Sequence, residues 1–203
     1  MLQGNSFPRA KTQGRRGCSA DTRFFRLFLA LLASCSCCRP AGGQSAPDEY
    51  RVKAAFLFHF AQLVEWPPES FAGGDSFNLC VVGDDPFRGE LENSLGGKSI
   101  GTRKIRVQHI KQNGEARGCQ VVFVGRAEAK RVPGIFEELG SAPIMTVGEN
   151  EEFLRQGGVI RFCLDENKVR FEINVGAAEK AGIKVSSRLL LLAKNVVGNQ
   201  GRG

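Results

Sequence analysis

The residues best suited to chemistry in this chain are an acidic pair, Asp84 and Asp85, which follow an apolar run and a glycine. Paired carboxylates of this kind hold Mg²⁺ in phosphoacceptor receiver domains, because hard cations favour oxygen ligands. Such a domain also needs an aspartate at the end of its third strand, where Val124 is followed here by Gly125 and Arg126. We therefore predict that the acidic pair forms a turn and a helix cap.

Other catalytic motifs are missing from the sequence. The two histidines, His59 and His109, are too few for a His-rich metal site. No Gly-x-Gly-x-x-Gly follows a predicted strand, no Gly-x-Ser-x-Gly elbow occurs, and no Cys-x-x-Cys lies beyond residue 47. We predict no catalytic residues, no cofactor and no metal site, and hence a protein that is not an enzyme.

Three cysteines lie outside the N-terminal segment. Cys80 and Cys119 occur in two apolar runs, and a bond between them would tie two strands of one sheet. The alternative is two buried free thiols. Cys163 lies between Phe162 and Leu164, so we predict a buried free thiol of low reactivity, the alternative being a redox sensor or an intermolecular bond.

Short apolar runs bounded by Gly, Asp or Pro predict the strands that must position these residues. A helix with apolar residues at helical spacing starts near Tyr50 and ends at Trp66, before two prolines. Strands and helices then alternate, which predicts a single α/β domain with a mostly parallel sheet flanked by helices. The expected strands are 77–82, 105–110, 119–124 and 143–147, and the expected helices are 87–95, 127–139 and 151–155.

The C-terminal section has a different pattern. Residues 158–164 and 168–175 predict an antiparallel hairpin, followed by a small helix from Ala177 and a final amphipathic helix over 186–197. In the second strand Arg170, Glu172 and Asn174 share one face, and the alternate residues are apolar.

The N-terminal residues 1–47 are predicted to be a signal peptide and short linker, because arginines precede an apolar run at 27–38. That run is too short to cross a membrane, which takes ~20 residues. An uncleaved anchor or a disordered tail is the alternative. The predicted domain occupies 48–197, and 198–203 is expected to be a disordered tail.

A lipid anchor is a further option in this segment. Leu32, Ala33, Ser34 and Cys35 have the form that lipoprotein processing enzymes accept, so acylated Cys35 could tether the chain to a membrane. The rival is a product cut between residues 41 and 46.

The net charge of +7 arises in the N-terminal segment. Residues 1–47 hold seven Lys and Arg against one Asp, so 48–203 hold 21 cations against 20 carboxylates. This balance argues against a nucleic-acid partner.

Several blocks of the sequence resemble the YfiR family of small exported bacterial proteins. The similarity covers about residues 49–195, and the block 169–178 reads Val-Arg-Phe-Glu-Ile-Asn-Val-Gly-Ala-Ala. The blocks are 53–67, 79–87, 146–148, 157–158, 169–178 and 181–190.

The resemblance implies a periplasmic, non-catalytic regulator. In the family's best-known member, the protein binds the periplasmic sensor part of an inner-membrane diguanylate cyclase and represses it, which controls c-di-GMP signalling and biofilm formation, and the resemblance implies the same partner for this chain. The family has a disulfide at the spacing of Cys80 and Cys119. Its best-known member has a second disulfide. In this sequence Cys163 has no cysteine left to pair with beyond residue 47 once Cys80 and Cys119 are joined, so a switch that relies on the second bond is in doubt.

The resemblance does not say which residues bind the partner, and it leaves a second function possible. Arg170, Glu172 and Asn174 are the candidate partner-binding residues, the alternative being the solvated face of an edge hairpin. A homodimer is compatible with this picture. A periplasmic small-ligand binder is the alternative function, with a crevice near residues 83–87, Gly125 and Arg126.

Overall fold

The computed structural model describes residues 46–111 and 113–198, which lie within the unit Gly43–Gly203. The predicted signal peptide, the lipidation residue Cys35 and residues 199–203 fall outside the described residues. The described chain begins with helix α2 (Ala46–Gln62) and ends with strand β10 (Asn195–Val197). The limits 48–197 predicted for the domain stay a prediction.

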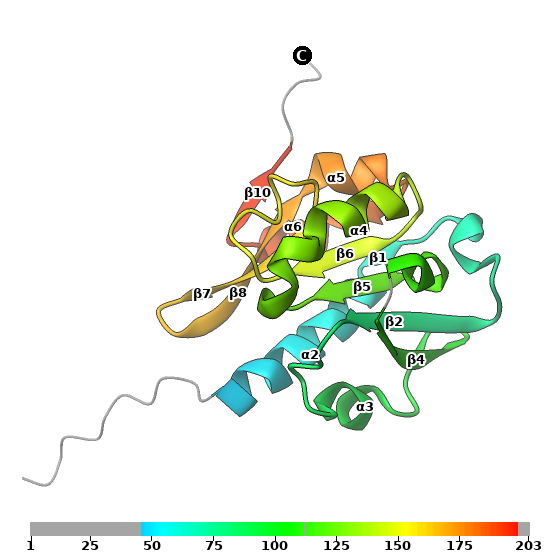
Figure 1. The fold of residues 1–203 in the computed structure, drawn as a ribbon, viewed down its shortest axis with the longest axis horizontal. Coiled ribbons are helices and arrows are strands. Elements are labelled where there is room, and N and C mark those ends of the chain that lie inside the picture. The colour runs from blue at the N-terminus through cyan, green and yellow to red at the C-terminus, as the bar shows by residue number, and fades with distance from the viewer. Residues whose placement is uncertain (1–45, 112, 199–203) are drawn as a thin grey trace, which may run out of the picture. The chain divides into compact units, whose positions relative to one another are not determined.

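An eight-stranded sheet forms the centre of the described chain, in the order β10-β8-β7-β6-β5-β2-β4-β3 (Figure 1). Five neighbouring pairs are parallel, and only β7 with β8 and β3 with β4 are antiparallel. This confirms the predicted α/β class with a mostly parallel sheet and a C-terminal hairpin. The remaining strands of this sheet are β2 (Ser76–Val82), β3 (Ser99–Ile100), β4 (Arg103–Ile110), β5 (Val121–Val124), β6 (Met145–Gly148), β7 (Ile160–Asp165) and β8 (Lys168–Asn174).

A two-stranded antiparallel sheet links the end of α2 to the C-terminal section. It pairs β1 (Val64–Glu65) with β9 (Lys184–Val185). The backbone N–H of Ser186 also donates to the carbonyl oxygen of Leu63 at 3.0 Å. The first and last parts of the domain therefore close on each other through backbone pairing.

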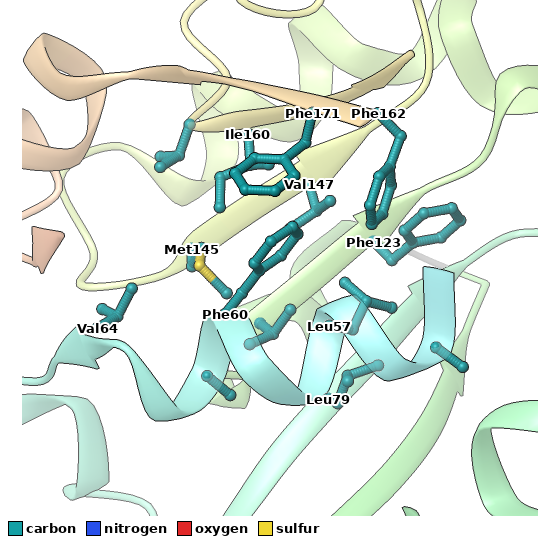
Figure 2. Close-up of a cluster of buried hydrophobic side chains, with 14 of the residues drawn as sticks. Leu57, Phe60, Val64, Leu79, Phe123, Met145, Val147, Ile160, Phe162 and Phe171 are labelled. Carbon is teal, nitrogen blue, oxygen red and sulfur yellow. The ribbon is translucent and has the colours of Figure 1, made fainter. Parts of the chain in front are cut away.

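Helix α2 covers one face of the large sheet because its buried residues recur at helical spacing. Phe60 is fully buried, and its ring centroid lies 4.8 Å from that of Phe171 and 5.6 Å from that of Phe162. Figure 2 shows Phe60 pointing from α2 toward Phe171 of β8 and Val147 of β6. The helix residues buried in this core are Ala54, Leu57, Phe60 and Ala61.

Helix α4 (Val132–Leu139) packs on the opposite face, where the alternate residues of the strands form a second core (Figure 1). Phe153, which is fully buried, lies in this core with its ring 5.3 Å from that of Phe136. Because both faces are covered, β5 and β6 are buried at every position. This explains why their sequences read as continuous apolar runs.

The C-terminal section differs in part from the prediction. The final helix is shorter than the predicted 186–197, since α6 spans Ser187–Leu192 and β10 then runs parallel to β8. Residues 151–157 form turns, so the helix predicted over 151–155 was wrong. Because β10 covers the edge of β8, the hairpin is not at the edge of the sheet. The other α-helices of the described residues are α3 (Glu90–Leu95) and α5 (Val175–Lys180).

Candidate functional site at the carboxyl ends of the parallel strands

The loops that follow the central parallel strands meet at one edge of the sheet. Strands β2 and β5 are parallel with Val82 opposite Val124, so residues 83–87 and Gly125 start side by side. The ring of Phe87 lies 4.7 Å from that of Phe123 and 5.2 Å from that of Tyr50 on α2. The structure thus brings together the loops predicted to line a crevice, and it adds the start of α2.

A buried carboxylate, Glu149, lies at this edge directly after β6 and is only 5% exposed. Its Oε1 accepts from Nζ of Lys53, and its Oε2 accepts from the backbone N–H of Arg126 at 3.0 Å and from the hydroxyl of Tyr50 at 3.2 Å. Buried charge is tolerated when it is paired and hydrogen-bonded in this way. These contacts fix α2 against the ends of β5 and β6.

Lys53 is 2% exposed and is the cation of this network. Its ammonium group also pairs with Glu49, one helical turn earlier, and lies 4.4 Å from the ring centroid of Tyr50. Burial and the neighbouring charge of Glu149 both raise the pKa of Tyr50, so its hydroxyl stays protonated and continues to donate. The ammonium group of Lys53 therefore pairs with the carboxylates of both Glu49 and Glu149, largely shielded from solvent.

A polar cavity of about 360 Å³ opens beside this network and is lined by Arg126, Glu149, Asn150, Glu151 and Glu152. Three carboxylates and one guanidinium favour a ligand that carries a positive group and hydrogen-bonding atoms. A second cavity, of about 330 Å³, lies away from this edge between α4 and α5. It includes apolar side chains such as Phe136 and Ile144.

Sequence reasoning missed Lys53 and Glu149 as a pair. The available signal was weak: a lysine directly beside the apolar stripe of the first helix, and an acidic residue directly after a buried strand. The two are 96 positions apart, and nothing local indicates that they meet.

The three predicted partner-binding residues have different environments. Arg170 is exposed, whereas Glu172 pairs with Arg161 at 2.7 Å between strands β7 and β8. The side chain of Asn174 accepts from the N–H of Ala177 at 3.0 Å and so caps helix α5. Glu172 and Asn174 therefore have structural contacts of their own, and Arg170 is the most accessible of the three.

Exposed leucines near this hairpin were not predicted. Leu191 is 85% exposed and Leu192 is 58% exposed on α6, while Leu164 is 48% exposed on β7. Lys194 connects the two regions, because its Nζ lies 2.8 Å from Oδ1 of Asp165 and its N–H donates to the carbonyl oxygen of Phe171. Leu192 is the last residue of α6, and its side chain lies outside the core.

The structure pairs Cys80 with Cys119 in a disulfide, with their Cα atoms 6.0 Å apart. Cys80 lies on the face of β2 that α4 covers, and Cys119 lies two residues before β5. Both residues are buried, at 0% and 3% exposure. The bond ties the second strand of the domain to the loop that enters the fifth.

Cys163 is a free thiol, but the prediction that it is buried was wrong, because it is only half-buried. The side chains of β7 alternate, so Cys163 faces away from its buried neighbour Phe162 and shares the side of Arg161. Partial burial and the charge of Glu172 raise its pKa, so the thiolate is still disfavoured.

We expect the native protein to alkylate slowly at Cys163. The raised pKa keeps the thiolate fraction below that of an ordinary cysteine at the same pH. Iodoacetamide labelling near pH 7.5, followed by mass spectrometry, would measure the rate against the same chain in denaturant. A native rate equal to the denatured rate would contradict the expectation.

The mostly parallel sheet, with a buried ionic network at its carboxyl edge, defines an α/β domain. The chain belongs to the YfiR/HmsC-like family, whose model matches residues 50–194. Membership suggests a periplasmic regulator of c-di-GMP signalling, and the family is regulatory rather than catalytic. Over the residues described, no helix has the length and apolar character needed to cross a membrane.

Two solved structures are similar in fold. A conserved domain protein from Vibrio cholerae O1 biovar El Tor has a TM-score of 0.51 and 12% identity. An ABC domain in complex with L-Trp from Streptococcus pneumonia has a TM-score of 0.47 and 9% identity, which is too distant to carry an argument. Each match covers 73% of this chain and 60% of the other one. The likeness to the Vibrio cholerae protein shows the fold alone.

Proposed function

We propose that this protein is exported to the periplasm, where it binds the periplasmic sensor part of an inner-membrane diguanylate cyclase and holds that enzyme inactive. The match of the YfiR/HmsC-like family over residues 50–194 is the observation that carries the proposal. In this role the protein controls c-di-GMP levels and biofilm formation by binding the cyclase, without catalysing a reaction. A tether through acylated Cys35 and a homodimer remain compatible predictions.

The surface we assign to the cyclase combines the hairpin with helix α6. Leu164, Leu191 and Leu192 supply exposed apolar area, and exposed Arg170 lies on the same hairpin as Leu164. An apolar centre with a charged rim is the usual composition of a protein interface. Lys194 holds the two parts together through Asp165 and Phe171.

Deleting the gene in its host is expected to raise c-di-GMP, and affinity capture from the membrane fraction is expected to recover a cyclase. Complementation with the Leu191→Ser, Leu192→Ser double variant should fail to lower c-di-GMP, because exposed leucines contribute to binding more than to folding. Arg106→Ser, at an exposed position on β4, is the matched control and should complement fully.

Unchanged c-di-GMP after deletion, with capture of a different envelope protein, would contradict the repressor assignment. A double variant that complements as well as the parent would leave the repressor function standing and remove the proposed surface.

A small-ligand binder is the second candidate, supported by the polar cavity of about 360 Å³ beside Glu149. The two functions are compatible, since a ligand that favours one state of the protein would bias the repressor. Equilibrium dialysis against cationic and zwitterionic metabolites tests it, with Glu151→Gln expected to weaken any binding in this cavity.

A further inference from the structure

Three side chains with metal-binding atoms meet beside the carboxyl end of β2, apart from the Glu149 network. Asp85 comes from the turn after β2, Glu92 from helix α3 and His109 from the end of β4. Each offers one ligand atom, and these atoms all lie within 4.8 Å of one another. The topology brings them together because β2 and β4 are parallel neighbours, with Val81 opposite His109.

Without an ion, two of the three side chains contact each other directly. Nε2 of His109 lies 2.7 Å from Oε1 of Glu92. Nitrogen and oxygen ligands lie ~2.0–2.2 Å from zinc, so two ligands of a tetrahedral site are separated by roughly 3.3 Å. Glu92 and His109 are both exposed, and small rotations of these side chains would bring the three atoms to that spacing.

Asp85 is held in place before any ion arrives. Its Oδ1 accepts from the N–H of Phe87 at 2.8 Å, and its Oδ2 accepts from the N–H of Gly89 at 3.0 Å. Each carboxylate oxygen keeps a second lone pair. This orientation lowers the entropic cost of binding, as hydrogen bonds to ligating carboxylates do in known sites.

We propose that Asp85, Glu92 and His109 form a binding site for a divalent transition metal of the Zn²⁺ type. One imidazole and two carboxylates are a donor set that suits Zn²⁺ and its neighbours, whereas Mg²⁺ and Ca²⁺ favour sites made of oxygen alone. The two carboxylates balance the charge of the ion while the imidazole is neutral. Three protein ligands leave a fourth position for water.

A bound ion would connect three elements that otherwise meet through few polar contacts: the turn after β2, helix α3 and the end of β4. The exposed contact between His109 and Glu92 contributes little to stability by itself. The site therefore gives the protein a means to sense metal in its surroundings, which goes beyond the proposed repression and does not depend on it.

The full chain should be titrated with ZnCl₂ by calorimetry, with MgCl₂ as the comparison ion. We expect one equivalent of Zn²⁺ to bind at this site, no comparable binding of Mg²⁺, and a rise in the thermal midpoint with Zn²⁺. His109→Gln and Glu92→Gln should each weaken this equivalent by at least ~10-fold, because each removes a ligand. Co²⁺ should give a visible d–d absorption band that His109→Gln removes.

Two matched controls are present in the chain. His59→Gln removes the only other histidine, which is exposed on α2, and Glu90→Gln removes a carboxylate from the same helix as Glu92. Both should keep the full affinity. Any Zn²⁺ that cysteines elsewhere in the chain bind is the same in the parent and in all the variants. The site is therefore assigned by the difference in Zn²⁺ binding between the parent and the His109 and Glu92 variants. The proposal would be overturned if the parent protein did not bind Zn²⁺. It would also be overturned if the His109→Gln and Glu92→Gln variants bound Zn²⁺ as tightly as the parent does.

Discussion

Replacing Lys53 by methionine is expected to lower the free energy of unfolding by about 3–5 kcal/mol, because it breaks a buried ion pair by removing one partner. Methionine keeps most of the side-chain volume but leaves the carboxylates of Glu49 and Glu149 facing each other without a cation. Glu149 cannot turn to water, since it is held in the interior by Tyr50 and Arg126. Denaturant unfolding followed by circular dichroism would measure the change.

A substitution of Glu149 provides the control, because removing the carboxylate disturbs the network less than removing the ammonium group. Glu149→Gln keeps an acceptor for Tyr50 and Arg126, and Lys53 still has Glu49 as a partner, so we expect a smaller loss than for Lys53→Met. The double variant should recover much of the stability that Lys53→Met loses, giving a coupling energy of about 1–3 kcal/mol.

An exposed ion pair offers a second comparison. Arg155→Met removes the partner of Glu152 on the surface and should change stability by less than ~1 kcal/mol. A loss for Lys53→Met no larger than for Arg155→Met would mean that the buried network is not a strong constraint on α2.

Much of the sheet could be predicted from the sequence because its central strands are buried on both faces. Residues 77–82 and 121–124 contain almost no polar side chains, and turn residues bound them, so the pattern was readable without knowledge of their partners. The antiparallel hairpin was readable for the opposite reason. Its second strand alternates between buried and more exposed residues, as a strand with two different faces does.

The C-terminal helix could not be read in the same way. A run of four leucines at 189–192 fits a buried helix, and periodicity cannot tell where such a helix stops. In the structure only Leu189 of this run is buried, and the chain turns at Ala193 because Asn195–Val197 can pair with β8. Tertiary pairing thus decided the boundary.

The Lys53–Glu149 network and the Asp85–Glu92–His109 cluster were out of reach for a related reason. Each joins residues from separate elements, and their proximity follows from the strand order and not from spacing along the chain. By contrast, the pairing of Cys80 and Cys119 was expected from the resemblance to the YfiR family, because that likeness carries three-dimensional information.

Removing the disulfide is expected to lower the free energy of unfolding by about 4 kcal/mol, the chain-entropy value for a loop of this size. The two cysteines are 39 positions apart, so the bond restricts a long stretch of the unfolded chain. Cys80→Ala with Cys119→Ala would measure this in urea, and Cys163→Ala, at a half-buried position outside the bond, is the matched control with an expected change below ~1 kcal/mol. Adding a reductant should lower the stability of the parent and of the Cys163 variant but not that of the double variant. If an unreduced digest of the protein from its own host contains both Cys80 and Cys119 as free thiols, the bond does not form in the cell. The reductant should then have no effect on any of the three proteins.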